Sequence, residues 1–488
     1  MADKDVGFDN EKYIRLQSEE IERRLKMFGD RLYLEVGGKL FDDLNFTRVA
    51  PGYDSGVKIE ILKKLKDKIE IIFCISAESI EKKKVRADYG ISYDAELLRL
   101  IGRAKNFGLS ITAVVITLFN NQPGAVKFKN QLERRKMKVY CHTYTKGYPT
   151  DVDTIVGREG YGAQEFVKTT KPIVVVAAPG PNGGKLATCL AQLYHENMRG
   201  QKAGYAKFET MPVWDFPLKH PINMAYEAAT ADVGDNNMID NFHIEKYGKL
   251  ATTYNRDLAV FPILKSILYK ITEKDIYNSP TDMGINMIGQ CIVNDNIIRT
   301  AAQNEIIRRY LDSLCDYKNG RFNIDVPNRI KLLMDELEIS IEDRKVVATA
   351  LEVKSIKDSE IVAIELKSGE VVTGKDMKIM TAPAAAVMNA IKQIGKIDDK
   401  IHLIAPESLS PILKLKQEIY GEAKLDLQDA LTAMAMSEAV DPVVKLAMLN
   451  LRKLSGLEAH STVMLNKSEL DFLKKLGMNV TCTDEFAH

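Results

Sequence analysis

The sequence carries no excess of charge of one sign. Its 488 residues include 68 Lys and Arg residues against 67 Asp and Glu residues, so that the formal net charge is +1. Proteins dedicated to DNA or RNA usually carry a strongly basic face or tail that neutralises phosphates. We therefore expect no nucleic-acid partner, and only a local basic patch would be compatible with one.

Two further absences narrow the class of protein. The six cysteines form no C-x-x-C pair, which argues against a structural zinc site, and no apolar run approaches the length of a membrane span. The first residues, MADKDVGFDNEKY, contain no apolar signal core. We therefore expect a protein of the reducing cytoplasm without a membrane partner, in which free thiols behave as small apolar groups.

The most informative stretch runs from Ile173 to Cys189 and reads IVVVAAPGPNGGKLATC. Its β-branched start predicts a buried strand, residues 179–184 form a loop of Gly, Pro and Asn, and Lys185 opens an apolar-faced helix. This layout is typical of a phosphate-binding loop. Glycines let backbone N–H groups converge on an anion, and the helix N-terminus and the lysine add positive charge.

The loop departs from the common G-x-x-x-x-G-K-[ST] pattern in its metal-binding part. Pro179 stands where the first Gly belongs, Leu186 stands where the Mg²⁺-binding Ser or Thr belongs, and Thr188 comes two residues late. The alternative is a plain strand-to-helix turn with an exposed lysine. The residues that we expect to hold the anion are Gly180, Asn182, Gly183, Gly184, Lys185 and Thr188.

Apolar runs alternate with helical patterns on both sides of this loop. Strands are predicted at 69–75, 111–118, 138–145 and 173–177, and helices at 95–104 and 125–135. Such alternation predicts an α/β fold whose mostly parallel sheet is covered on both faces and contains a P-loop-like strand, glycine-rich loop and helix. Ligands of such sheets bind beyond the carboxyl ends of the strands, where this loop would lie.

The pattern changes twice along the chain, which predicts three parts. Residues 1–210 form the P-loop-like domain, residues 211–325 a helical subdomain, and residues 326–488 a separate C-terminal α/β domain. Within the subdomain, residues 283–292 are expected to be helical. The C-terminal domain is expected to begin with a β-meander at 346–353, 360–366 and 370–373.

A dense polar stretch follows the loop and supplies candidates for chemistry. We predict that Asp232, Asp235 and Asp240 hold Mg²⁺, because clustered carboxylates are typical magnesium ligands near a phosphate cradle. His220 and Glu227 are candidates for contact with the acceptor, and Asp235 for catalysis. The alternative is a solvated loop between helices, in which the aspartates serve as N-caps.

Two further groups deserve a hypothesis each. Arg256 could neutralise phosphate charge near the loop. In the C-terminal domain, Glu458, His460 and Thr462 alternate along a predicted strand, so that their side chains share one face. A Glu beside a His can position or protonate it, whereas an ordinary polar strand face is the favoured interpretation.

The chain resembles a bacterial family known as domain of unknown function 1846, an uncharacterised protein family. The resemblance covers nearly the whole chain and implies a multi-subdomain α/β protein of about this length, but no established reaction. In that family the position of Leu186 is often Met, which implies that the missing Mg²⁺ hydroxyl is a family trait. The resemblance rests on 34–40 (LEVGGKL), 178–181 (APGP), 184–185 (GK), 203–210 (AGYAKFET), 218–221 (LKHP), 226–232 (YEAATAD), 279–284 (SPTDMG) and 458–461 (EAHS).

Together these patterns favour a nucleotide- or phosphometabolite-binding enzyme. In the sharpest form it uses ATP and Mg²⁺ for phosphoryl transfer or ligation on a small molecule, and Lys185 stabilises the developing charge. Its partner would be a small phosphorylated ligand. The sequence is also compatible with a homo-oligomer. One alternative is a non-catalytic anion-binding, metabolite-binding or assembly module. Another places the chemistry around Glu458 and His460.

Overall fold

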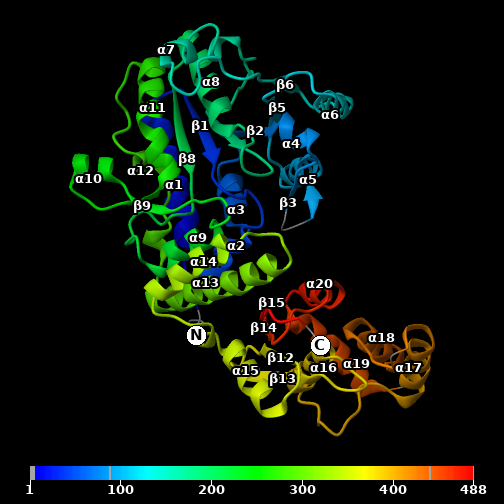
Figure 1. The fold of residues 1–488 in the computed structure, drawn as a ribbon. Helices are drawn as coiled ribbons and strands as arrows, with labels where there is room; N and C mark the ends of the chain where they lie inside the picture. Colours follow the sequence, from blue (N-terminus) through cyan, green and yellow to red (C-terminus); the bar gives the residue numbers. More distant parts are fainter. Residues whose placement is uncertain (1–5, 87–89, 422, 439–440, 487–488) are drawn as a thin grey trace. The chain divides into compact units, whose positions relative to one another are not determined.

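The computed structural model describes residues 6–86, 90–421, 423–438 and 441–486. The chain divides into two compact units, one that ends at Ala302 and one that begins at Gln303 (Figure 1). The division into residues 1–210, 211–325 and 326–488 stays a prediction. Among the helices of the described residues, none combines the length and the apolar character that a membrane crossing requires.

A parallel sheet of seven strands forms the centre of the first unit, which confirms the predicted α/β fold with a mostly parallel sheet. Its order is β11 (Gly284–Ile285), β8 (Ala203–Phe208), β1 (Arg31–Val36), β7 (Ile173–Ala177), β2 (Ile69–Ser76), β5 (Ile111–Thr117) and β6 (Val139–Cys141). Every residue of β2 and β7 is buried, as expected for strands that are covered on both faces.

The described residues before α13 form the helices α1 to α12 and two small antiparallel ribbons, β3 (Val85–Arg86) with β4 (Ile91–Ser92) and β9 (Asn237–Ile239) with β10 (Thr252–Tyr254). The helices are α1 (Asn10–Phe28), α2 (Leu44–Val49), α3 (Val57–Lys64), α4 (Ala77–Glu81), α5 (Tyr93–Asn106), α6 (Pro123–Arg134), α7 (Val152–Ile155), α8 (Lys185–Met198), α9 (Pro221–Ala229), α10 (Asn241–Tyr247), α11 (Asn255–Thr272) and α12 (Pro280–Met283).

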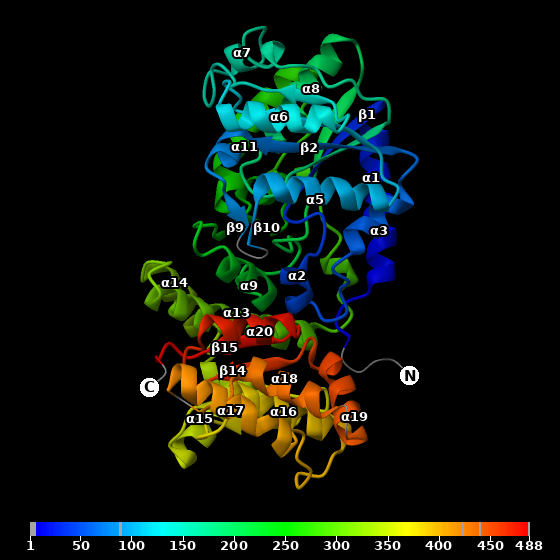
Figure 2. The same ribbon diagram turned by 90° about the vertical axis from the view of Figure 1, so that its right-hand side faces the viewer.

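Helices cover both faces of the seven-stranded sheet (Figure 2). Tyr33 of β1 donates to Glu196 of α8 at 2.9 Å, so α8 lies on the face to which Tyr33 points. Leu32 precedes Tyr33 in β1, so its side chain lies on the opposite face. Gly204 of β8 is the register neighbour of Leu32, and on this opposite face Phe28 of α1 lies against it. Helix α11 packs beside α8, and α3 packs beside α1.

The order of the strands creates a reversal in the middle of the sheet. From β2 the chain continues to β5 and β6, then returns to β7, and from there it continues in the other direction to β8 and β11. Strands β7 and β2 are therefore neighbours whose connections run to opposite sides. Open α/β sheets bind ligands at such a switch point, beyond the carboxyl ends of the strands. The glycine-rich loop follows β7 at this place.

The predicted helix at residues 283–292 is wrong. Residues Gly284 and Ile285 pair with β8 as strand β11, and only Gly289–Cys291 form a short 3₁₀ turn. The reason lies in Asn286, whose side chain accepts from the N–H of Ile288 at 3.0 Å and donates to the carbonyl of Pro212 at 2.9 Å. Such side-chain bonds to the backbone compete with the hydrogen bonds of a helix.

The second unit contains a mixed sheet of four strands, which confirms a separate C-terminal α/β domain. Its order is β13 (Val371–Lys375), β12 (Ile361–Glu365), β14 (Glu458–Ser461) and β15 (Asn479–Cys482). The remaining helices of the described residues are α13 (Asp295–Lys318), which includes the boundary residues Ala302 and Gln303, α14 (Asp325–Glu336), α15 (Lys345–Lys357), α16 (Ala382–Gly395), α17 (Pro406–Tyr420), α18 (Leu427–Ser437), α19 (Pro442–Asn450) and α20 (Lys467–Lys475).

The first strand of the predicted meander, residues 346–353, is wrong as well, because these residues form the helix α15. The buried residues of α15 are Val346, Val347 and Ala350. Their spacing places them on one side of a helix, and α15 packs on the sheet of this unit, where it contacts β12. Packing of an apolar face thus outweighs the β-propensity of the two valines. The meander strands near 360–366 and 370–373 are confirmed as β12 and β13.

Replacement of Gly204 by Ala should destabilise the first unit, because a Cβ atom there would lie 1.9 Å from Cγ of the Phe28 ring. We expect a loss of about 1–3 kcal/mol in the free energy of unfolding, as is usual for an overpacked core. Urea unfolding followed by circular dichroism measures it. Gly102→Ala in α5 is the matched control, since its Cβ would meet no atom within 4 Å. Equal stability of Gly204→Ala and the wild type would contradict this packing.

Candidate functional site

The glycine-rich loop after β7 leaves no space for side chains at its glycines. A Cβ on Gly183 would lie 2.7 Å from Cβ of Ala178, and one on Gly184 would lie 2.6 Å from the side chain of Thr117. Gly184 also has φ +82°, a conformation that favours glycine. Thr117 donates to the carbonyl of Gly183 at 3.0 Å and so fixes the loop to the end of β5.

The N–H groups of Asn182 and Gly184 donate to no protein acceptor in the described part of the chain. Lys185 begins α8, and the first N–H groups of a helix lack partners within the helix. Unpaired amides and a helix N-terminus therefore lie together at the switch point of the sheet. This combination is suited to an anion.

The charge of Lys185 is shared with a carboxylate on the neighbouring strand. Its Nζ lies 3.9 Å from Oε1 of Glu35, which is the fifth residue of β1, and both side chains are mostly buried. Tyr205 donates to the other oxygen of Glu35 at 2.8 Å. Lys185 thus lies beside the loop, and its long contact with Glu35 is a weak ion pair that an anion at the loop could replace.

Thr188, a predicted anion ligand, lies elsewhere. It is fully buried, and its hydroxyl accepts from Sγ of Cys74 in β2 at 3.4 Å. Burial raises the pKa of Cys74 to about 12, so the thiol stays protonated and can donate this bond. The hydroxyl of Thr188 therefore helps to hold α8 against the sheet.

A second ion pair lies beside the first, at the carboxyl ends of β1 and β8. Lys207 of β8 is the register neighbour of Glu35, so that their side chains share one face of the sheet. Lys207 forms an ion pair with Asp257 of α11 and lies 3.8 Å from Glu209. Burial acts to lower the pKa of Lys207, but the carboxylates of Asp257 and Glu209 outweigh it and raise this pKa.

Glu209 occupies a space that two glycines leave open. A Cβ on Gly37 would lie 3.4 Å from Cγ of Glu209, and one on Gly284 would lie 2.9 Å from Oε2. Tyr254 donates to Oε1 at 3.3 Å. Burial raises the pKa of the Glu209 carboxyl to about 7; Lys207 opposes this shift and Asp257 adds to it. A carboxyl that titrates near neutral pH is suited to proton transfer.

The network extends from Tyr254 to the predicted catalytic residue Asp235. The rings of Tyr254 and Tyr226 lie 6.2 Å apart, and Arg256, one residue before Asp257, forms an ion pair with Asp235. Asp235 is buried, and its Oδ1 has no hydrogen-bond partner among the described residues.

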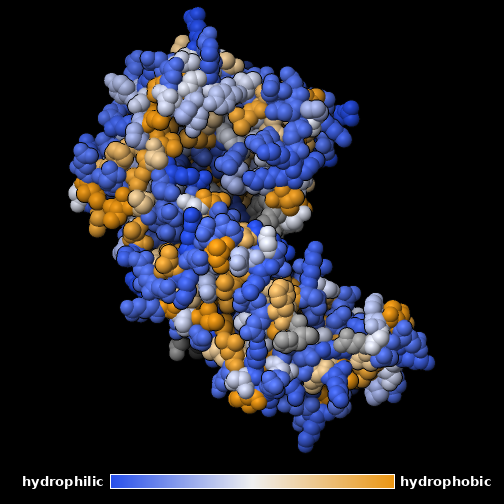
Figure 3. All heavy atoms as spheres, viewed as in Figure 1, coloured by the Kyte–Doolittle hydropathy of each residue, from blue (hydrophilic) through white to orange (hydrophobic). Residues whose placement is uncertain are grey.

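Figure 3 shows the surface of this unit hollowed near the strand ends, with mostly hydrophilic residues around the hollow.

The three predicted magnesium ligands have separate surroundings. Asp240 accepts from the N–H of His243 at 3.0 Å as the N-cap of α10 and from the hydroxyl of Thr281 at 2.6 Å. Asp232 is exposed, and Asp235 is paired with Arg256. In the described residues, no three His, Cys, Asp or Glu side chains are grouped so as to hold a metal ion. The magnesium site stays a prediction.

His220 and Glu227, the candidates for acceptor contact, both make bonds that stabilise local structure. His220 caps α9, where its Nδ1 accepts from the N–H of Ile222 at 3.2 Å and its Nε2 lies 2.9 Å from Asp295. Burial lowers the pKa of His220, which favours a neutral ring with its proton on Nε2. Glu227 accepts from the N–H of Asn237 at 3.2 Å. Their catalytic roles stay predictions.

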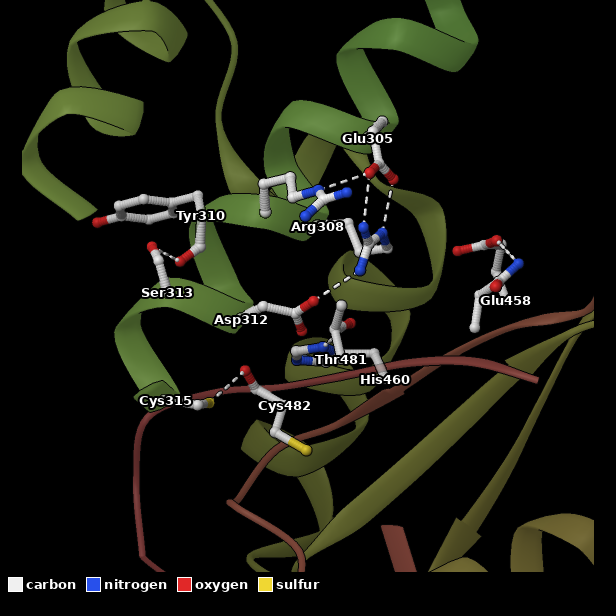
Figure 4. A network of polar contacts seen from close by, with 12 residues as sticks. Glu305, Arg308, Tyr310, Asp312, Ser313, Cys315, Glu458, His460, Thr481 and Cys482 are labelled. Atoms are coloured by element: carbon white, nitrogen blue, oxygen red, sulfur yellow. Dashed lines mark hydrogen bonds and ion pairs between the residues drawn. The ribbon is translucent and has the colours of Figure 1, made fainter. Parts of the chain in front are cut away.

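In the second unit, Glu458 and His460 of β14 lie beside Thr481 of β15 (Figure 4), and Arg344 links them. Arg344 donates to Glu458 and, at 2.6 Å, to the hydroxyl of Thr481, which lies 3.0 Å from Nδ1 of His460. Burial, with help from Arg344, lowers the pKa of His460 to about 3, so the ring is neutral. These bonds join the N-cap residue of α15 to β14 and β15, as expected for a structural polar face.

Four charged residues beside the loop have no role in the sequence-based hypothesis: Glu35, Lys207, Glu209 and Asp257. A signal for three of them is present. Glu35 stands near the end of β1, and Lys207 and Glu209 alternate at the end of β8. Charged residues at the carboxyl ends of otherwise apolar parallel strands are candidates for a site. Asp257 has no such signal, because it reaches the site from a helix about fifty residues further along the chain.

The fold and this site define an α/β protein with a doubly wound parallel sheet and a polar site at its switch point. Two family models match the chain, "Domain of unknown function DUF1846, N-terminal" over residues 6–338 and "Domain of unknown function DUF1846, C-terminal" over residues 342–488. The chain belongs to this family, which confirms the resemblance seen in its sequence.

Close relatives cover the whole length of the chain. A UPF0371 protein of Clostridioides difficile (strain 630) is 49% identical over 492 residues, which are 99% of this chain and 98% of the relative. UPF0371 proteins of Clostridium botulinum strain Eklund 17B / Type B and strain Kyoto / Type A2 are 50% and 49% identical, with the same shares covered. Their names state a family and no activity.

Removal of the Glu209 carboxyl should change how stability depends on pH. In the native state its pKa is about 7, against a usual value of 4.5, so the native state binds this proton more tightly than the unfolded state. This part of the stability is present below about pH 4.5 and is lost as the pH rises to about 7. Glu209→Gln lacks this loss. Between pH 5 and pH 8, its free energy of unfolding should therefore rise relative to that of the wild type by about 1–3 kcal/mol.

Urea unfolding of both proteins at several pH values measures this difference. Glu60→Gln is the control, because Glu60 is a half-exposed carboxylate on the surface of α3. Its stability should follow the wild type at each pH. Parallel curves for Glu209→Gln and the wild type would show that Glu209 titrates as an ordinary carboxyl.

Proposed function

We propose that this protein binds a phosphorylated small molecule at the glycine-rich loop and acts on it as a cytoplasmic enzyme. The observation that carries the proposal is the set of unpaired amides at Asn182, Gly184 and the start of α8, with Lys185 beside them. Phosphate oxygens would accept from these amides, as they do at other helix N-termini. Lys185 would leave its 3.9 Å contact with Glu35 and pair with the phosphate.

The reaction class that fits best is phosphoryl transfer or ligation of a small molecule with ATP. Such reactions require positioning of the phosphates and stabilisation of their charge, which the loop and Lys185 would supply. Mg²⁺ would reach the site with the nucleotide. Leu186 offers no hydroxyl and that of Thr188 is buried against Cys74, so the start of α8 would supply no side-chain ligand to the metal ion.

The second candidate is a module that binds an anion without turnover. The side chain of Thr188 favours it, because the nearest hydroxyl of the helix is turned toward β2 rather than the loop. Binding that is indifferent to Mg²⁺, with no product formed, would distinguish this module from an ATP-dependent enzyme.

A thermal-shift screen of ATP, GTP, sugar phosphates, phosphate and sulfate, each with and without Mg²⁺, tests the proposal. A ligand at about 100 times its Kd stabilises the native state by about 2.7 kcal/mol, which gives a readily measured rise in Tm. We expect at least one phosphorylated ligand to raise Tm of the wild type. Lys185→Ala should bind it at least tenfold more weakly, because the variant lacks the only lysine of the loop.

Lys63→Ala is the control for the loss of one positive charge, since Lys63 pairs with Glu60 on α3. It should bind as the wild type does. Ligand affinity that is the same in Lys185→Ala and Lys63→Ala, or no shift with any of the anions, would contradict phosphate binding at the loop.

A further inference from the structure

The cluster of charged residues at the ends of β1 and β8 contains fewer lysines than carboxylates. Lys185 pairs with Glu35, and Lys207 pairs with Asp257, which accounts for both lysines of this cluster. Glu209 is the third carboxylate, 3.8 Å from a lysine that is already paired. All of these groups are mostly buried, where a carboxylate without its own cation favours the protonated form.

The groups that face Glu209 come from every element packed around it. Among the described groups with the largest effect on its carboxyl, Lys207 is the only cation, and the others are carboxylates or a tyrosine, which add no positive charge. The groups are Glu35 of β1, Tyr205 and Lys207 of β8, Tyr226 of α9, Tyr254 of β10 and Asp257 of α11, with Lys185 of α8 beyond Glu35.

One oxygen of Glu209 is free to hold a proton. Tyr254 donates to Oε1, whereas Oε2 accepts no hydrogen bond from the described residues and lies against the open side of Gly284. A small enclosed space adjoins this carboxyl; it is lined in part by Trp214, Thr253 and Asn286. The carboxyl is therefore held by one oxygen and accessible at the other.

The cluster connects this carboxyl with the loop. An oxyanion at the loop would attract Lys185 away from Glu35, because a doubly charged ligand is the stronger partner. Glu35 would then depend on Lys207, its neighbour in the sheet register, and Lys207 would be shared among three carboxylates. Glu209, whose contact with Lys207 is the weaker one, is the group that would lose its charge first.

We propose that Glu209 takes up one proton from water when an oxyanion binds at the loop, and is the proton-exchanging residue of the site. The inference rests on the proposed function, since it requires an anion beside Lys185. The proton binds to Oε2 and converts the carboxylate to a carboxylic acid; it returns to water when the anion leaves. A ligand that needs a proton on a leaving oxygen could receive it from this acid, which then ends as the carboxylate.

The raised pKa of Glu209 agrees with this role, because a carboxyl that titrates at about 7 exchanges its proton readily at neutral pH. Without the anion the carboxyl is partly ionised at that pH. Binding of the anion shifts it toward the acid, so anion affinity and proton uptake are linked.

Isothermal titration calorimetry with sulfate tests the inference. Sulfate keeps its double charge throughout the neutral range, so any proton taken up belongs to the protein. At about pH 8, titrations in buffers of different ionisation enthalpy should give an uptake of close to one proton per sulfate for the wild type. Above the pKa of Glu209 the wild-type Kd should rise about tenfold per pH unit.

Glu209→Gln keeps the shape of the side chain and removes its proton. It should bind sulfate without proton uptake, with a Kd that changes less than about twofold over the same pH range. Glu60→Gln should behave as the wild type. Sulfate binding without uptake in the wild type, or uptake that persists in Glu209→Gln, would overturn the inference and leave the proposed function standing. No sulfate binding by either protein would overturn both.

Discussion

A shortage of positive charge at the carboxyl ends of β1 and β8 governs the chemistry of the first unit. Lys185 and Lys207 are surrounded by three mostly buried carboxylates, those of Glu35, Asp257 and Glu209. Burial makes each unpaired charge costly, so the cluster is stable only if a carboxyl is protonated or further positive groups compensate it. The N–H groups of Asn182 and Gly184 in the adjacent loop donate to no acceptor among the described residues, so they would be stabilised by a negatively charged group. A bound oxyanion would satisfy the amides and, with one proton, would preserve the balance of charge.

The fold brings these groups together through strand order. Because the chain reverses direction between β2 and β7, the loop after β7 opens at the switch point of the sheet. Helix α8 then carries Lys185 at its first residue and packs along the face of β1 and β8 that bears Glu35 and Lys207. Small residues allow this close assembly: Gly37 and Gly284 leave the space that the side chain of Glu209 fills. The helical segment from α9 to α12 supplies the remaining members, Tyr254 and Asp257.

Local patterns in the sequence were sufficient for β2, β5, β6 and β7 and for the loop after β7, because each of these elements is contiguous in the chain. They failed where distant contacts decide. Residues 346–353 have the β-branched content of a strand but form α15, whose apolar face packs on β12. The side chain of Thr188 could not be placed, since its direction depends on Cys74 in another strand. Glu209 and Asp257 could not be joined to Lys185, because strand register and the position of α11 bring them there. The family name adds no reaction, so the site itself carries the functional argument.

The most direct test of the account is a crystal structure of the wild type with tungstate, an oxyanion whose metal atom scatters anomalously. The account predicts a bound tungstate whose oxygens lie within hydrogen-bond distance of the amides of Asn182 and Gly184. Nζ of Lys185 should have moved from Glu35 to the anion. Tungstate bound elsewhere on the protein, with the loop empty and the contact between Lys185 and Glu35 unchanged, would contradict the claim that this loop is an anion site.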